Sequence, residues 1–156
     1  MKTELILVGK TNDKLYIEGI KDYTERICHY MPFSIHTIPA IKNTKNLSEE
    51  QQKQAEGELI LKILQPSDTV VLLDEHGTER TSMDYAKWLQ KKLQTRKRLM
   101  FVIGGPYGFS DAVYKRCDEK ISLSKMTFSH QMVRLIFTEQ LYRACTIIKG
   151  ESYHHE

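Results

Sequence analysis

The sequence is poor in the features that mark secreted, metal-binding and membrane proteins. Its three cysteines, Cys28, Cys117 and Cys145, are odd in number and widely spaced, which predicts neither a disulfide framework nor a zinc site. Its longest apolar runs, such as Val70–Leu73, are far shorter than the roughly 20 residues of a membrane-spanning helix. The N-terminal residues MKTELILVGK lack the apolar segment of a signal peptide. We therefore expect a cytoplasmic protein with no membrane segment and no bound metal.

Repeats, linkers and low-complexity segments are also missing, so we expect residues 1–156 to form one domain. With 40% hydrophobic and 28% charged residues, the composition is that of an ordinary soluble globular protein. The net charge of +3 is too small to imply a nucleic-acid partner by itself. Cations do gather between Lys91 and Arg98. They form either a solvated helix end, where the helix dipole favours positive charge, or a patch that contacts phosphate.

Apolar periodicity and turn residues predict strands that alternate with helices. The predicted strands are Glu4–Val8, Phe33–Ile38, Asp68–Leu73, Leu99–Ile103 and Lys120–Ser124. The predicted helices are Lys14–Tyr30, Ser48–Leu64, Ser82–Gln94, Ser110–Cys117 and His130–Lys149, and Ser48 with Gln51 forms a capping box for the second. A turn, Asp74–Arg80, follows the third strand. This order predicts an α/β fold with a mostly parallel sheet flanked by helices.

A glycine-rich turn, IGGPYG at Ile103–Gly108, follows the fourth predicted strand. Glycine lets the backbone come close to a ligand, and ligands of open α/β sheets lie beyond the carboxyl ends of the strands. The turn is not a P-loop, because it lacks Gly-Lys-Ser/Thr, and it is not a dinucleotide fingerprint, because it lacks G-x-G-x-x-G. It is either a binding loop or a structural turn.

The last predicted helix carries two arginines that cannot face the same way. Arg134 follows His130 by one turn, and Arg143 follows Glu139 at the spacing of a favourable ion pair. The arginines are nine residues apart, which places them about 180° apart around the helix axis. Either one is a surface cation, the commoner situation for a helical arginine, or the helix lies at a subunit interface and each arginine serves a different site.

The tail ends in Tyr153, His154 and His155. Chain ends are commonly frayed, so a disordered end is one interpretation. The alternative is a Tyr/His acid–base group that the tail brings into a cleft. A metal site is not expected, because adjacent histidines lack the spacing that directs ligands at one ion.

Three motifs in order closely resemble the RlmH family of small SPOUT-class methyltransferases. They are FVIGGPYG at Phe101–Gly108, LSKMTFSHQMVRLIFTEQLYRA at Leu123–Ala144, and the terminal pair Tyr153-His154. The resemblance extends over essentially the whole chain. It implies a SPOUT-type α/β fold whose C-terminal part is tied in a deep trefoil knot.

The resemblance also implies an activity and a site. The activity is S-adenosylmethionine-dependent methylation of N3 of a pseudouridine in 23S rRNA, on the assembled ribosome, by a homodimer. Matching positions give the catalytic residues as Arg143, Tyr153 and His154. They give the cofactor-binding residues as Leu73, Gly104, Leu123, Ser124, Lys125, Met126, Thr127 and Phe128.

These residue types suit that chemistry. The N3 imide must lose its proton before it can attack a methyl group, and a histidine, which ordinarily titrates near neutral pH, suits a general base. We therefore expect His154 to take the proton, directly or through a water, and Tyr153 to position the base or stack on it. Arg143 would stabilise the negative charge on the flanking carbonyls.

Two other functions remain to be compared with this one. A non-catalytic ribosome- or RNA-binding α/β protein would need neither the glycine turn nor the tail. A nucleotide hydrolase is disfavoured, because the turn lacks Lys-Ser/Thr and no metal-binding aspartate is evident.

Overall fold

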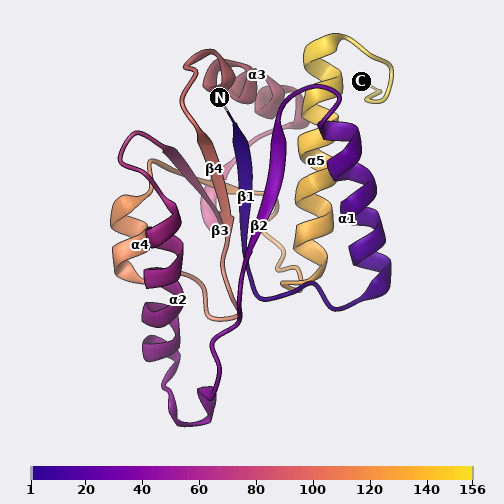
Figure 1. The fold of residues 1–156 in the computed structure, drawn as a ribbon. Coiled ribbons are helices and arrows are strands. Elements are labelled where there is room, and N and C mark those ends of the chain that lie inside the picture. The colour runs from indigo at the N-terminus through magenta and orange to yellow at the C-terminus, as the bar shows by residue number, and fades with distance from the viewer. Residues whose placement is uncertain (1, 156) are drawn as a thin grey trace.

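A computed structural model of the chain describes residues 2–155, along which strands and helices alternate as predicted (Figure 1). The strands are β1 (Thr3–Val8), β2 (Phe33–Ile38), β3 (Thr69–Glu79), β4 (Leu99–Ile103) and β5 (Glu119–Ser122). The helices are α1 (Lys14–Ile27), α2 (Glu49–Ile63), α3 (Ser82–Gln94), α4 (Asp111–Arg116) and α5 (Met132–Lys149), and a single 3₁₀ turn, η1 (Thr44–Asn46), precedes α2.

The strands form one five-stranded sheet in the order β2-β1-β4-β3-β5, and neighbouring strands run parallel. The predicted α/β class with a parallel sheet flanked by helices is confirmed. Because the strands are parallel, their carboxyl ends meet at one edge, where α1 and α5 also begin (Figure 1). The deep trefoil knot stays a prediction.

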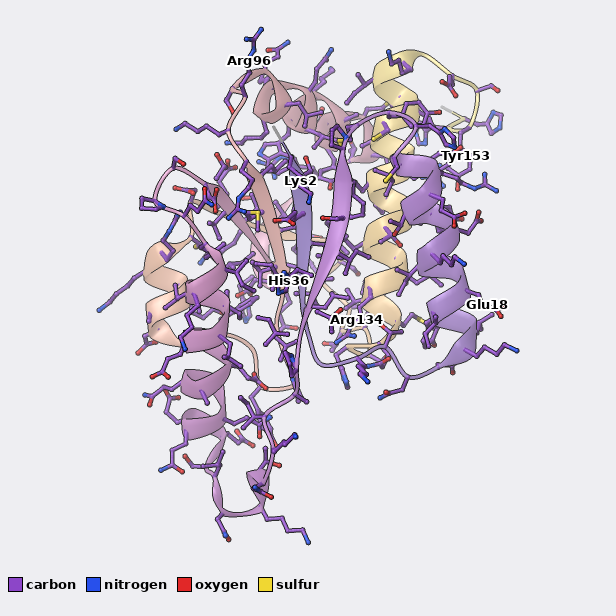
Figure 2. The ribbon with its side chains drawn as sticks, viewed as in Figure 1. Lys2, Glu18, His36, Arg96, Arg134 and Tyr153 are labelled. Atoms are coloured by element: carbon purple, nitrogen blue, oxygen red, sulfur yellow. The ribbon has the colours of Figure 1, made fainter. Side chains whose placement is uncertain are left out.

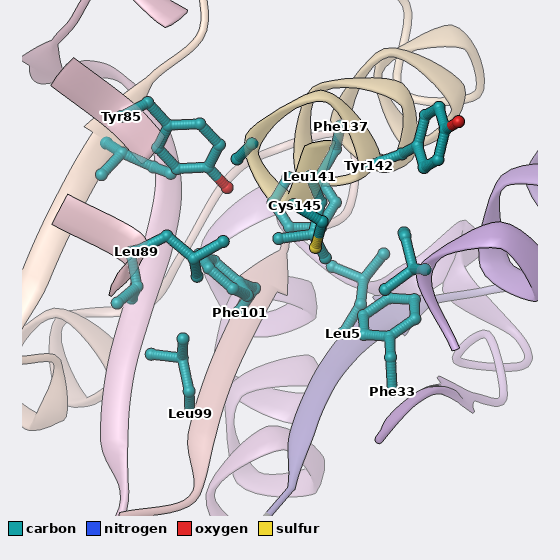
Figure 3. Packing of buried hydrophobic residues seen from close by; sticks show 14 of the residues in the cluster. Leu5, Phe33, Tyr85, Leu89, Leu99, Phe101, Phe137, Leu141, Tyr142 and Cys145 are labelled. Atoms are coloured by element: carbon teal, nitrogen blue, oxygen red, sulfur yellow. The ribbon is translucent and has the colours of Figure 1, made fainter. Parts of the chain in front are cut away.

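Helices cover both faces of the sheet, because its buried strands alternate their side chains between two apolar cores. Leu5 and Phe101 belong to the larger core, under α1, α3 and α5, where α5 contributes Phe137, Leu141 and Cys145 (Figure 3). Ile6 and Val102 face the other way, into a smaller core under α2 and α4. The sheet therefore lies in the middle of three layers.

Side-chain caps explain where four of the helices begin. The predicted capping box is confirmed, since Ser48 accepts from the Gln51 backbone and the Gln51 side chain accepts from the Ser48 backbone. The side chains of Asp13, Thr81 and Ser110 accept a backbone hydrogen bond at the starts of α1, α3 and α4 in the same way. Each cap satisfies an N–H group that the first helical turn leaves unpaired.

The predicted turn at Asp74–Arg80 is wrong, because β3 continues to Glu79. A shift in register between Leu73 and Thr78 interrupts its pairing with β5, which then resumes at Thr78 and Glu79. Gly77 lies inside this irregularity, where a Cβ atom would come within 2.7 Å of the Lys120 and Ile121 backbone. The polar DEHGTE segment is therefore a bulged strand that passes close to its neighbour.

The basic cluster between Lys91 and Arg98 divides into two groups. Lys92 forms an ion pair with Glu119, and Arg98 donates to both carboxylate oxygens of the buried Asp68, at 2.9 and 2.6 Å. Lys91, Arg96 and Lys97 are exposed. Part of the cluster therefore holds α3 and β4 in place, and the rest is exposed, so that a contact with phosphate stays a prediction for these residues.

Candidate active site

A cavity of about 800 Å³ opens at the carboxyl edge of the sheet. Its walls come from the ends of β3, β4 and β5, the segments that follow β4 and β5, and the first turn of α5. This is the position at which open parallel sheets bind their ligands.

Nearly all the residues expected to bind the cofactor line this one cavity. The lining includes Leu73, Gly104, Leu123, Ser124, Met126, Thr127 and Phe128. Lys125 is not part of the lining; its side chain is exposed, and its Nζ lies 3.8 Å from Glu79 Oε1. Segments that are far apart in the sequence thus meet at the ends of three neighbouring strands.

The glycine turn forms one wall of the cavity in a tight, closed conformation. The Gly108 N–H donates to Gly105 O at 3.1 Å, and Gly108 has a φ of +84°, which favours glycine. A Cβ on Gly104 would lie 3.0 Å from the Phe109 ring. The turn therefore depends on its glycines, and its Pro106 and Tyr107 also line the cavity.

The cavity also has a carboxylate rim that the sequence did not reveal. Asp74 and Glu75, at the bulge of β3, line it together with Glu49 of α2. Tyr114 donates to Asp74 Oδ2 and Thr127 donates to Glu75 Oε2, at 2.5 and 3.3 Å. Burial and the bond to Asp74 raise the pKa of the Tyr114 hydroxyl. In the sequence, Asp74 and Glu75 directly follow a buried apolar run, which could have indicated the rim. The prediction of a turn at this segment hid that indication.

The tail packs against α5 and forms a second cluster of polar side chains. Arg143 binds Glu139 (Nη2 to Oε2, 3.1 Å), which confirms the predicted ion pair, and its Nη1 lies 3.1 Å from His154 Nδ1. The Tyr153 hydroxyl donates to Glu139 Oε2 at 3.0 Å, and the Arg143 guanidinium lies 4.8 Å from the centre of the Tyr153 ring. Arg143, Tyr153 and His154 are therefore in contact, and the interpretation of the tail as a frayed end is wrong as far as His154.

These contacts determine how the two tail side chains can handle a proton. Burial, together with the hydrogen bonds that the Tyr153 hydroxyl makes with Tyr23 and to the Glu139 carboxylate, raises the pKa of Tyr153, so this hydroxyl stays protonated and acts as a donor. An arginine N–H can only donate, so His154 Nδ1 accepts from Arg143, and a neutral imidazole then carries its proton on Nε2. Nδ1 can accept a substrate proton only after Arg143 moves to another acceptor.

The tail cluster and the cavity lie at opposite ends of α5. Val133, in the first turn of α5, lines the cavity, whereas Arg143 lies ten residues further along, about 15 Å at 1.5 Å per residue. Figure 2 shows Tyr153 at one end of the α5 layer and Arg134 at the other. Within one chain, the expected catalytic and cofactor-binding residues do not form a single site.

Arg134 is not a surface cation; of the roles expected for it in a dimer, support of the packing or service to the partner's site, its contacts agree with the first. Its side chain is fully buried (0% exposed), and it donates to Val8 O, Gly9 O and Thr11 Oγ1 at 2.8, 2.9 and 3.0 Å. These acceptors belong to β1 and the loop that follows it. Arg134 therefore ties the start of α5 to the end of β1, and His130, which lies before the helix, lines the cavity instead.

Residues 2–155 contain neither a cluster of metal ligands nor a helix that could span a membrane. In this part of the chain no group of three or more His, Cys, Asp or Glu side chains could hold a metal ion. None of the helices between Lys2 and His155 is long and apolar enough to cross a bilayer.

Comparison with known proteins identifies the family. Residues 1–154 match the family model described as "Predicted SPOUT methyltransferase". The chain is 63% identical to a "Ribosomal RNA large subunit methyltransferase H" from Parabacteroides distasonis and 61% identical to one from Bacteroides fragilis, each over 157 residues and 100% of both chains. A solved structure, "a probable methylase family protein from Haemophilus influenzae Rd KW20", shares the fold at a TM-score of 0.51 with 11% identity, over 99% of this chain and 70% of that one. The chain belongs to the SPOUT methyltransferase family.

Proposed function

We propose that this protein transfers the methyl group of S-adenosylmethionine to N3 of a pseudouridine in 23S rRNA, on the assembled ribosome in the cytoplasm. The observation that carries the proposal is the convergence of Leu73, Gly104 and all of the segment Leu123–Phe128 except Lys125 on one cavity. The names of the full-length relatives support a large-subunit rRNA substrate.

The residues of the cavity fit the proposed cofactor. Its volume, about 800 Å³, lies in the range of small-molecule sites. Leu73, Leu123 and Phe128 offer apolar surface to the adenine ring of the cofactor. The turn at Gly104 offers backbone groups for hydrogen bonds. The carboxylates of Asp74 and Glu75 can accept from hydroxyl groups and attract a positive charge. When bound, the cofactor supplies the electrophilic methyl group.

The tail cluster would prepare the nucleophile. We propose that Arg143 leaves His154 Nδ1 and binds a carbonyl oxygen next to N3, which stabilises the negative charge that spreads there. His154 Nδ1 is then able to take the N3 proton, directly or through a water, and N3 would attack the methyl carbon as the bond from that carbon to the sulfonium sulfur breaks and leaves a neutral thioether. Tyr153 keeps Glu139 and Arg143 in place and stays protonated throughout. The remaining rate enhancement would come from the alignment of N3 with the methyl group.

A homodimer is part of the same proposal, because one chain separates its tail from its cavity. In a two-fold dimer, the tail of one protomer can reach the cavity of its partner, and each site then contains both halves. The deep trefoil knot around the cofactor loops belongs to this proposal as well.

Methyl transfer to ribosomes that lack the modification tests the function directly. With labelled S-adenosylmethionine, we expect label on intact ribosomes, mapped to one pseudouridine, and little on free 23S rRNA. His154→Ala should lower the rate by about 10²–10⁴-fold, the range of general acid–base catalysis.

The other outcomes discriminate between functions. Cofactor binding without transfer would point to a different RNA substrate, and neither binding nor transfer would favour a non-catalytic ribosome-binding protein. Near-normal turnover of His154→Ala would remove His154 from the mechanism.

A further inference from the structure

Glu56 is a buried carboxyl group that the mechanism above does not use. It lies in α2 and is 4% exposed, and no salt bridge joins it to a cation in the described part of the chain. Its Oε2 accepts from Gln52 Nε2 at 3.2 Å, whereas its Oε1 is buried without a partner. Burial raises the pKa of this carboxyl group.

The Glu56 carboxyl group packs directly against the glycine turn. A Cβ placed on Gly105 would lie 2.7 Å from Glu56 Oε1, 2.9 Å from Oε2 and 3.0 Å from Cδ. Gly105 itself lines the cavity, and Glu56 is not among the lining residues. The turn therefore has the cavity on one side and the carboxyl group of α2 on the other.

The next residue of α2 supports the far end of the same segment. A Cβ on Gly57 would lie 2.4 Å from Ser110 Oγ, and Ser110 is the residue that caps α4. Glu56 and Gly57 thus contact both ends of the segment from Gly105 to Ser110. The position of α2 on the sheet fixes where this segment lies.

Packing alone does not explain a carboxyl group at this position. Burying it without a full set of partners costs free energy, and a methionine of similar length would fill the space without that cost. Gly105 and Ser110, on the segment that faces Glu56, carry no charge, and Gln52 on its own helix is neutral. What the carboxyl group adds is an unsatisfied oxygen beside the backbone of a ligand-binding turn.

We propose that Glu56 is a positioning residue for S-adenosylmethionine, which sets the place of Gly105 and offers Oε1 to a backbone N–H of the turn when the cofactor is bound. This inference rests on the proposed function of the cavity. Glu56 acts through the turn and does not touch the cofactor.

A matched pair of variants tests it. Glu56→Gln keeps the length of the side chain and an acceptor oxygen, whereas Glu56→Met keeps the length and has no such acceptor. By calorimetry with S-adenosylmethionine, we expect Glu56→Gln to bind within about threefold of the wild type and Glu56→Met to bind about tenfold more weakly, the size of one hydrogen bond. The KM for ribosomes should stay the same in both, which a general loss of structure would not produce.

A double-mutant cycle tests the contact independently of how either variant folds. Gly105→Ala should weaken cofactor binding, and the double variant with Glu56→Ala should bind no more weakly than Glu56→Ala alone, because the shorter side chain makes room for the new methyl group. Gly104→Ala serves as the control, because its Cβ would meet Phe109 and Gly108, so Glu56→Ala should not rescue it.

The outcomes separate this inference from the function on which it rests. Suppose that the wild type binds S-adenosylmethionine. Equal affinities of Glu56→Gln and Glu56→Met for the cofactor would then overturn the role of Glu56 and leave the proposed function intact. Additive effects of Gly105→Ala and Glu56→Ala would do the same. A wild type that does not bind the cofactor overturns the proposed function and this inference together.

Discussion

At the scale of single residues, the two arginines of α5 show how surroundings decide what one side chain does. Arg143 is partly exposed and shares Glu139 with Tyr153, so its charge is balanced and remains accessible to a substrate. Arg134 has backbone and hydroxyl acceptors only, and burial lowers its pKa. The surroundings of Arg143 suit a residue that binds a substrate, whereas those of Arg134 suit a residue that fastens α5 to β1.

The Tyr153 hydroxyl provides a test of the tail cluster. Tyr153→Phe keeps the ring against Arg143 and removes the bond to Glu139, so we expect a loss of stability of about 1 kcal/mol. Because Glu139 loses the donor that helps hold it beside Arg143, we expect kcat to fall about tenfold, the effect of a catalytic group held slightly out of place. The KM for S-adenosylmethionine should not change. Steady-state kinetics on unmodified ribosomes measure both constants.

Tyr30→Phe is the control for that measurement. It removes another tail hydrogen bond, from the Tyr30 hydroxyl to Glu151 at 2.7 Å, and it does not touch Arg143. Equal losses of kcat in the two variants would mean that the Tyr153 hydroxyl only anchors the tail.

Local spacing predicted one of these arginine environments and not the other. The pair of Glu139 and Arg143 follows from a separation of four residues on a helix. The partners of Arg134 at Val8 and Gly9 lie 126 and 125 positions away, so no local pattern encodes them. Burial of a lone arginine is rare, and only the assembled sheet provides the carbonyl groups that make it possible.

At the scale of elements, regular segments were predictable and the irregular strand was not. The bounds predicted for β2, α3 and β4 agree with the structure, because their apolar periodicity is clear. The second half of β3 has polar residues and a glycine, which locally resemble a turn. Its pairing with β5 is a tertiary contact that overrides this local preference.

The bulge at Gly77 directly follows three residues that line the cavity, Asp74, Glu75 and His76. In Gly77→Ala the new Cβ would meet backbone atoms of Lys120 and Ile121, which cannot turn aside as a side chain can. We expect a loss of about 1–3 kcal/mol, the usual range for overpacking. Cofactor binding should weaken as well, because β5 leads into Leu123–Phe128. Urea unfolding and calorimetry measure the two effects.

Gly19→Ala is the matched control for the bulge. Its Cβ would also come within 2.7 Å of a neighbour, but that neighbour is Leu135 Cδ1, at the end of a flexible side chain. Equal stability and equal cofactor affinity of the two variants would show that the bulge does not position the wall of the cavity.

At the scale of the whole molecule, α5 separates the tail cluster from the cavity, and the proposed methyl transfer would bring the two together in a dimer. The cavity end of the molecule also carries exposed apolar side chains, with Leu15 69%, Ile17 45% and Met132 40% exposed. Leu15, in the first turn of α1, therefore faces solvent. These exposed apolar side chains are surface that the second copy in the proposed homodimer would cover.

Mixing two inactive variants tests whether each site draws on two chains. Arg143→Ala removes the tail cluster's cation, and Gly104→Val fills the cavity wall, so each homodimer should be inactive. In mixed dimers one of the two sites combines an intact tail with an intact cavity. Random exchange makes half of the dimers mixed, so we expect about a quarter of wild-type methyl transfer. Native mass spectrometry verifies that mixed dimers form, and mixed dimers without activity would show that one chain supplies the whole site.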